Sequence, residues 1–168
     1  QVLIRVEMTS VNFADIKSRY GKKGAAKLPF IPGLDATGVI EEVGSEVKNL
    51  RVGQRVIAFP ANGSYAEYVV ADEALTFAIP DSISTETAAA CPVVSFTSYQ
   101  LLAKVALLAE GETVLIHAAA GGIGTTAIQL AKLLGAWAAR QKPKLLWLPE
   151  RIMSFATTRK TLWKKYAS

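Results

Sequence analysis

Short apolar segments alternate with turn residues from the start of the chain to about Pro80. Four of these segments have the length and composition typical of β-strands, namely VLIRV, GVIEEV, QRVIAF and SYAEYVV. The segments IPGLD, VGSEVKNL and PANGS between them carry the glycine, proline and asparagine of turns. The pattern predicts a mostly β region whose short strands close into a small barrel.

The spacing of apolar residues becomes helical from Ser84 onward. Ser84 is a suitable N-cap, and Glu86 suits the positive end of the helix dipole. A second helix is predicted over about 98–108, with its apolar stripe at Leu101, Leu102, Val105 and Leu108. The consecutive apolar residues of TVLIHA then favour a buried parallel strand, and the helical segment IGTTAIQLAKLLG follows a glycine loop. This order is the first half of a βαβ unit, and no second strand is evident after it.

The loop between this strand and this helix contains Ala119, Ala120, Gly121, Gly122, Ile123 and Gly124. Its spacing is that of the dinucleotide-binding fingerprint G-x-G-x-x-G, with Ala119 in place of the first glycine. Gly121 would let a diphosphate approach the backbone beside the helix N-terminus, and Gly124 would allow close packing of the helix on the strand. The alternative is a glycine-rich turn that only packs the helix on the sheet.

The residue that reads the adenosine ribose should follow about 20 residues after the loop. That place holds Gln141, Lys142 and Pro143. The sequence therefore leaves the choice between NADPH and NADH open.

Residues 137–168 form an atypical basic tail. They carry eight basic residues, one acidic residue, all three tryptophans and no glycine, whereas residues 1–136 carry 11 basic and 13 acidic residues. The formal charge of +5 therefore arises in the tail. Our interpretation is that the tail is out of frame, because plausible codons for 149–155 read one base earlier encode Gly-Ala-Asp-Tyr-Val-Ile. The alternative is a basic arm that binds nucleic acid or an anionic membrane, but Pro143 and Pro149 interrupt any helical face. We expect neither partner.

Three further features bear on membrane insertion, on the redox compartment and on where in the domain the chain begins. No apolar run reaches the roughly 18 to 20 residues of a membrane span, so no transmembrane helix is predicted. The single Cys91 excludes an internal disulfide and a Cys-based zinc cluster, and we expect a cytoplasmic protein. The first residues, QVLIRVEM, read directly into a strand, so the chain is expected to begin inside a domain whose N-terminal strand is missing.

Six motifs resemble the medium-chain dehydrogenase/reductase superfamily, in particular its zinc-independent quinone oxidoreductase branch. They are VNFAD, PGLDATGVIEEVG, VGQRVIAF, SYAEYVV, AAACPVVSFTSYQLL and GETVLIHAAAGGIG. The resemblance implies an α/β fold with a β-barrel, in which a GroES-like catalytic domain (1–95) precedes the first βα unit of an incomplete Rossmann domain (96–136). It also implies NADPH in the cleft between the domains and, in intact family members, a homodimer.

The resemblance also assigns site residues. Asn12 would face the nicotinamide and the substrate, Asp15 would support the surrounding contacts, and Thr97 would contact the cofactor. Lys17 stands where quinone reductases often carry a tyrosine and is assigned to the same site. The alternative for Asn12 and Asp15 is a helix cap, because NFAD also suits a helix start.

No metal site is expected. Zinc alcohol dehydrogenases of the same family would have a cysteine at Asn12 and a His-Glu pair at Leu34 and Asp35, and zinc would not normally choose Asn12 or Leu34 as ligands. The lone His117 is interpreted as a packed strand residue rather than a ligand or a catalytic group.

Two functional hypotheses follow. The first is an NADPH-dependent reductase that transfers a hydride to a small quinone or enone, with hydrogen bonds from the protein to the developing oxyanion. The second is a catalytically inactive chain with at most a binding or scaffolding role. Because only one strand and one helix of the cofactor domain are predicted, we expect very weak cofactor binding and little turnover.

Overall fold

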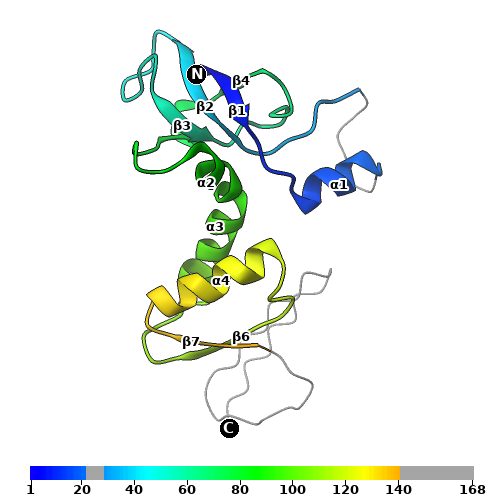
Figure 1. The fold of residues 1–168 in the computed structure, drawn as a ribbon, viewed down its shortest axis with the longest axis vertical. Coiled ribbons are helices and arrows are strands. Elements are labelled where there is room, and N and C mark those ends of the chain that lie inside the picture. The colour runs from blue at the N-terminus through cyan, green and yellow to red at the C-terminus, as the bar shows by residue number, and fades with distance from the viewer. Residues whose placement is uncertain (22–28, 141–168) are drawn as a thin grey trace. The chain divides into compact units, whose positions relative to one another are not determined.

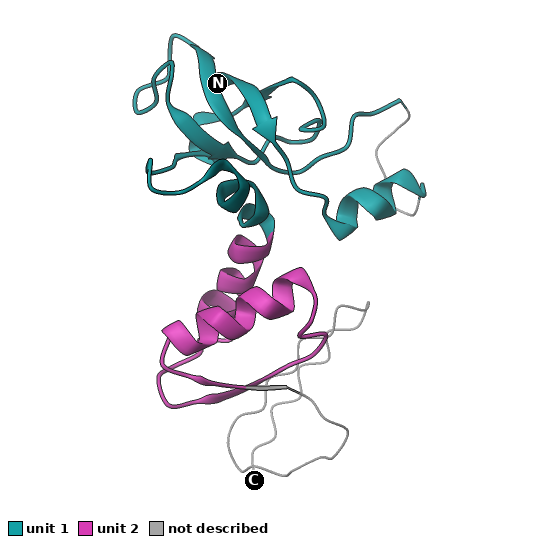
Figure 2. Ribbon diagram, in the orientation of Figure 1, with its two compact units in different colours: residues 1–93 teal, residues 94–168 magenta. Residues whose placement is uncertain are grey.

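The structure is a computed structural model that describes residues 1–21 and 29–140. It divides into two compact units, residues 1–93 and residues 94–168 (Figures 1 and 2). The first unit contains the predicted β region, and the second contains the predicted strand, glycine loop and helix. Within the described residues, no helix combines the length and the apolar character needed to cross a membrane.

The sheet of the first unit has five antiparallel strands. They are β1 (Val2–Met8), β2 (Ala36–Val43), β3 (Arg55–Ala58), β4 (Tyr68–Ala71) and β5 (Thr76–Ala78), in the hydrogen-bonded order β4-β1-β2-β3-β5. β4 and β5 are the outer strands of this order, yet only Asp72 and the short 3₁₀ turn η1 (Glu73–Leu75) connect them. The sheet must therefore curve round until its edges approach each other, as the predicted small barrel requires. β5 lies outside the four segments predicted as strands.

Alternate side chains of the first four strands share one apolar core. Ile4 on β1 pairs with Ile40 on β2 and with Val69 on β4, and all three side chains are buried. Burying an aliphatic side chain of this size stabilises the fold by roughly 1.5–3 kcal/mol. The register is fixed for this reason, because a slip of one residue would turn the buried side chains of a strand toward water.

The carboxylate of Glu73 ties the segment between β2 and β3 to η1. Its Oε1 accepts the backbone N–H of Asn49 at 2.6 Å and that of Lys48 at 3.0 Å. These hydrogen bonds, that of Asn49 first, lower the pKa of Glu73 below its ordinary value of 4.5. The ionised carboxylate therefore contributes stability at neutral pH, which is lost as the pH falls through the lowered pKa.

Two short helices belong to the first unit, α1 (Phe13–Arg19) and α2 (Thr85–Ala90). α2 packs against β1 and β2. The predicted N-cap of α2 is confirmed, because Ser84 Oγ accepts the backbone N–H of Thr87 at 3.3 Å.

The helix predicted over 98–108 has different bounds. It begins at Pro92 as α3 (Pro92–Tyr99) and continues as the π-helical segment η2 (Gln100–Val105). Proline is favoured at the first position of a helix, where its missing N–H is not needed. The π turn, in which the Ala106 N–H donates to the Leu101 carbonyl at 2.8 Å, rotates the residues that follow relative to α-helical spacing. Leu102 and Leu108 are therefore buried as predicted, whereas Val105 is 51% exposed.

The second unit contains a complete βαβ unit, which corrects the expectation that no second strand follows the helix. β6 (Thr113–Ile116) leads through the glycine loop to α4 (Gly122–Leu133), and β7 (Trp137–Arg140) then pairs with β6 in parallel. Gly135, at φ 74°, makes the turn from α4 to β7. The first four residues of the expected tail therefore form a strand, and 141–168 lie outside the described residues.

We predict that Thr37→Val stabilises the first unit. Thr37 lies on β2 with 1% of its surface exposed, and its Oγ1 has no hydrogen-bond partner among the described residues. Removing an unpaired buried hydroxyl should raise the free energy of unfolding by about 1 kcal/mol in urea titrations. Thr76→Val is the matched control, because Thr76 Oγ1 donates to the Asp72 carbonyl at 2.8 Å and its loss should destabilise. Equal effects of the two substitutions would contradict this reasoning.

A second prediction concerns acid stability. Glu73→Gln keeps an acceptor oxygen near Asn49 and Lys48 but removes the charge that these N–H groups favour. The variant should have a lower melting temperature than the wild type at neutral pH. This difference in melting temperature should shrink as the pH falls below 4.5, the ordinary pKa of a glutamate. Thermal melts of both proteins across this pH range measure the difference. A difference that stays constant down to the most acid pH would show that the charge of Glu73 is not involved.

Candidate functional site

The predicted site residues of the first unit lie at the start of α1. Asn12 is the N-cap of this helix and Asp15 is its third residue, and together they form the reciprocal pair of a capping box. The Asn12 N–H donates to Asp15 Oδ2 at 2.8 Å. The helix-cap alternative raised by the sequence is therefore present in the structure, and both residues are also buried, with 9% and 6% of their surfaces exposed.

The Asp15 carboxylate does more than cap α1. Its Oδ1 accepts the backbone N–H of Gly33 at 3.1 Å, and its Oδ2 accepts the Tyr65 hydroxyl at 3.3 Å. Burial, followed by the charge of Asp15 and its hydrogen bond, raises the pKa of Tyr65 above its ordinary value. Tyr65 therefore stays protonated at neutral pH and acts as a donor that braces Asp15.

Lys17 is not part of this cluster. Its side chain is exposed, and its Nζ lies 4.7 Å from the centroid of the Phe13 ring. The structure thus brings Asn12 and Asp15 together and leaves Lys17 on the outer surface of α1. Arg19, two residues further on, is exposed as well.

A second buried carboxylate, at the position where zinc enzymes of the family would have a glutamate, lies beside Asn12. Asp35 is 1% exposed and accepts the backbone N–H of Ser10 at 3.1 Å and the Ser10 hydroxyl at 2.7 Å. Asn12 Nδ2 in turn donates to Ser10 Oγ at 2.9 Å. Thr9 and Ser64 extend the network through a contact of 2.9 Å between their hydroxyl oxygens.

The signal for this network was available in the sequence but weak. The polar pair Thr9-Ser10 separates the apolar strand β1 from the helical NFAD segment, and such a pair is usually only a turn. As for zinc, the described residues contain no group of three or more histidine, cysteine or acidic side chains placed to hold a metal ion. Leu34, which stands at the expected histidine position, offers no donor atom.

The glycine loop of the second unit connects β6 to α4. Ala118 adopts a positive φ of 52°, and its carbonyl accepts the Gly121 N–H at 3.0 Å. α4 starts at Gly122, with Gly121 at the N-cap, no side-chain cap and no acidic residue in the first turn. The N–H groups at the start of a helix lack intrahelical partners, so Gly122, Ile123 and Gly124 can offer theirs to an anion.

The glycines of the loop differ in what the protein itself requires of them. A Cβ at Gly124 would lie 2.5 Å from the Ala118 carbonyl oxygen and 2.6 Å from Ala119 Cα, so close packing requires glycine there. A Cβ at Gly121 would meet only the Ala118 oxygen, at an ordinary 3.4 Å, and Gly121 has no positive φ. No described residue of the second unit therefore requires glycine at 121, which agrees with a position kept without a side chain for a ligand.

The other members of the predicted cofactor site lie in or near this loop. Ala119 is half-buried against the apolar core of the second unit, whereas Ala120 is exposed. Thr97 is half-buried on α3, but the hydrogen bond from that helix to the start of α4 comes from its neighbour, because Ser98 Oγ donates to the Ile123 carbonyl at 3.0 Å. His117 follows the end of β6 and is half-buried in the turn.

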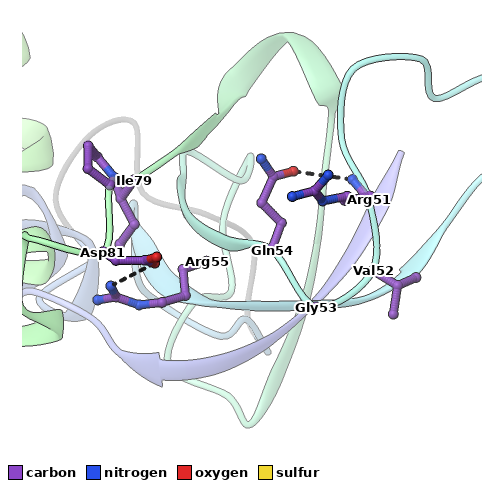
Figure 3. A pocket seen from close by; sticks show the side chains of 8 residues that line it. Arg51, Val52, Gly53, Gln54, Arg55, Ile79 and Asp81 are labelled. Carbon is purple, nitrogen blue, oxygen red and sulfur yellow. Dashed lines mark hydrogen bonds and ion pairs between the residues drawn. The ribbon is translucent and has the colours of Figure 1, made fainter.

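One hollow of the first unit lies away from the predicted site residues. It is lined by residues 51–55 and 79–81, where Arg55 Nη1 lies 4.0 Å from Asp81 Oδ1 (Figure 3). None of the predicted site residues lines it. We assign no function to this hollow.

Comparisons with known proteins agree with the expected fold and family. Residues 1–81 match the model of the alcohol dehydrogenase GroES-like domain, which confirms the expected fold of the first unit. The chain is 41% identical over 133 residues to a synaptic vesicle membrane protein VAT-1 homolog from Danio rerio, a match that covers 79% of this chain and 28% of that protein. It is 39% identical to a quinone oxidoreductase from Lama guanicoe, with 79% of this chain and 41% of that protein covered.

Among solved structures, the Escherichia coli quinone oxidoreductase complexed with NADPH superposes with a TM-score of 0.78 at 35% identity, covering 83% of this chain and 43% of that chain. The chain thus spans less than half the length of these three relatives. It belongs to the medium-chain dehydrogenase/reductase superfamily, and its relatives place it in the quinone oxidoreductase-like branch of that superfamily.

Proposed function

We propose that this protein is a cytoplasmic NADPH-dependent oxidoreductase that transfers a hydride to a small electron-poor acceptor, a quinone or an enone. The observation that carries the proposal is the start of α4. α1 and α2 fill their N-termini with Asp15 and Ser84, whereas α4 has neither a side-chain cap nor an acidic residue in its first turn. The N-terminus of α4 is therefore uncapped, and it lies beside Gly121, which packing does not require to be glycine. Both features favour binding of a diphosphate.

Different residues would bind the different parts of the cofactor. The N–H groups of Gly122, Ile123 and Gly124 would hold the diphosphate, Thr97 would contact the cofactor, and Asn12 would contact the nicotinamide end. NADPH, when bound, supplies the hydride. Support for NADPH rather than NADH comes from the relative solved with that cofactor.

The surroundings of Asn12 favour an apolar acceptor. The side chains on either side of it along the chain, Val11 and Phe13, are 75% and 69% exposed. Large apolar side chains left open to water beside a buried polar group are typical of sites for apolar ligands.

One observation favours the second hypothesis, an inactive chain with at most a binding role. Within the described residues the sheet of the second unit has two strands, β6 and β7, and the apolar side chains of Leu133 and Trp137 are 82% and 72% exposed. A parallel sheet is normally covered on both faces. The isolated 168-residue chain should therefore bind NADPH only weakly.

Titration of NADPH into the 168-residue chain, followed by cofactor fluorescence, separates the two hypotheses. We expect measurable binding with a dissociation constant well above the micromolar range, because the sheet of the second unit has two strands within the described residues. Saturation at micromolar NADPH would support the active reductase, and turnover with a quinone should then be detectable. No binding up to millimolar NADPH would support the inactive chain.

Gly121→Ala tests where the diphosphate binds. The added methyl group has room in the free protein, so the melting temperature should stay unchanged. The affinity for NADPH, measured by ligand-observed NMR, should fall about tenfold or more, which corresponds to about 1.4 kcal/mol. Gly44→Ala adds the same methyl group in the first unit and should leave the affinity unchanged.

Gly124→Ala should, in contrast to Gly121→Ala, lower the stability of the protein. Its methyl group would collide with the backbone of Ala118 and Ala119, so this variant should lose several kcal/mol of stability whether or not cofactor is present. If Gly121→Ala binds NADPH as tightly as the wild type does, the diphosphate does not lie on this loop.

A further inference from the structure

We propose that Asp35 is a positioning residue that acts through Ser10 to fix the orientation of the Asn12 amide, so that Asn12 presents a hydrogen-bond acceptor to its ligand. This inference rests on the proposed function in one respect, the identity of the ligand. The orientation itself is a property of the free protein and can be tested without cofactor.

The contacts form a continuous chain from a buried carboxylate to the site. The Ser10 hydroxyl oxygen lies 2.7 Å from Asp35 Oδ2 and 2.9 Å from Asp35 Oδ1. Asn12 Nδ2 lies 2.9 Å from the same hydroxyl oxygen and 3.5 Å from Asp35 Oδ2. Asp35 is 1% exposed, and none of the ion pairs among the described residues includes it.

The direction of these hydrogen bonds is set by chemistry. A carboxylate only accepts, and a serine hydroxyl has a single hydrogen to donate. Because Ser10 gives that hydrogen to Asp35, its oxygen can only accept from Asn12. The neighbour of Ser10 must therefore be the NH₂ group of Asn12, and not its carbonyl oxygen.

This direction determines what Asn12 can recognise. Nδ2 is directed to Ser10 and Asp35, and Oδ1, which is directed to the Asp15 N–H in the capping box, keeps a second lone pair for a ligand. An acceptor binds a donor, such as a hydroxyl or a carboxamide N–H of the nicotinamide nucleotide.

The first test measures the Asn12 side-chain amide by ¹⁵N NMR, with the resonances identified by their loss in Asn12→Ala. In the wild type, the Nδ2 protons should exchange with water about tenfold or more slowly than those of the exposed Asn49. Asp35→Asn and Ser10→Ala should each remove this protection and shift the resonances. Asp81→Asn, the same substitution at a fully exposed site, should change neither.

Two variants keep this test decisive. If Asp35→Asn does not fold, Ser10→Ala carries the test alone, because it removes only the bridging hydroxyl. Unchanged Asn12 resonances in a folded Ser10→Ala variant would overturn the proposal, whether or not the chain binds NADPH.

The second test is a double-mutant cycle on NADPH affinity with Asp35→Asn and Asn12→Ala. Each single variant should weaken binding by about tenfold, and the double variant should be no weaker than Asn12→Ala, because Asp35 acts through Asn12. Losses that add would show a merely structural role for Asp35 and overturn the proposal. If the wild-type chain binds no NADPH, the proposed function fails and the NMR test alone decides the orientation.

Discussion

The arrangement of the first site depends on one buried carboxylate, that of Asp15. Its two oxygens accept hydrogen bonds from the start of α1, from Gly33 before β2, and from Tyr65 before β4. Because three segments far apart in the sequence meet there, loss of the carboxylate would leave buried donors unpaired, at about 1–3 kcal/mol for each. The backbone of Asn12 is thereby held in place by Asp15, while its side-chain amide is oriented separately by Ser10 and Asp35.

The second unit shows the opposite use of a helix N-terminus. At α1 and α2 the protein satisfies the first-turn N–H groups with its own side chains, which secures the helix. At α4, the four residues 118–121 that lead into the helix are alanine and glycine, Ala118 has a positive φ, and no side chain caps the helix. A helix without an N-cap side chain is less stable than a capped helix by roughly 1 kcal/mol. A bound anion can offset this loss of stability.

The sequence predicted those features that depend on local chemistry. Alternating apolar residues indicated β1 to β4, Ser84 indicated a cap, and the spacing of Gly121 and Gly124 indicated the loop. It did not reveal β7, because Trp-Ala-Ala-Arg has little intrinsic strand preference and becomes a strand only by pairing with β6. It gave the helix of α3 and η2 different bounds, and it placed Val105 on the apolar stripe although Val105 is exposed, because a π turn changes the helical period. It also missed the link from Ser10 to Asp35, because these residues are 25 positions apart and meet only once β1 and β2 have paired.

The burial of Asp35 is difficult to explain by stability alone. A carboxylate removed from water without a cation is costly, and replacing buried charges by apolar groups is often neutral or stabilising. Ser10 could be held by an uncharged acceptor just as well if anchoring the chain were the only requirement. An uncharged amide at position 35, however, could donate as well as accept, and then Ser10 and Asn12 could reverse the direction of their hydrogen bonds. A carboxylate allows one direction only, so Asp35 gives the site a single orientation.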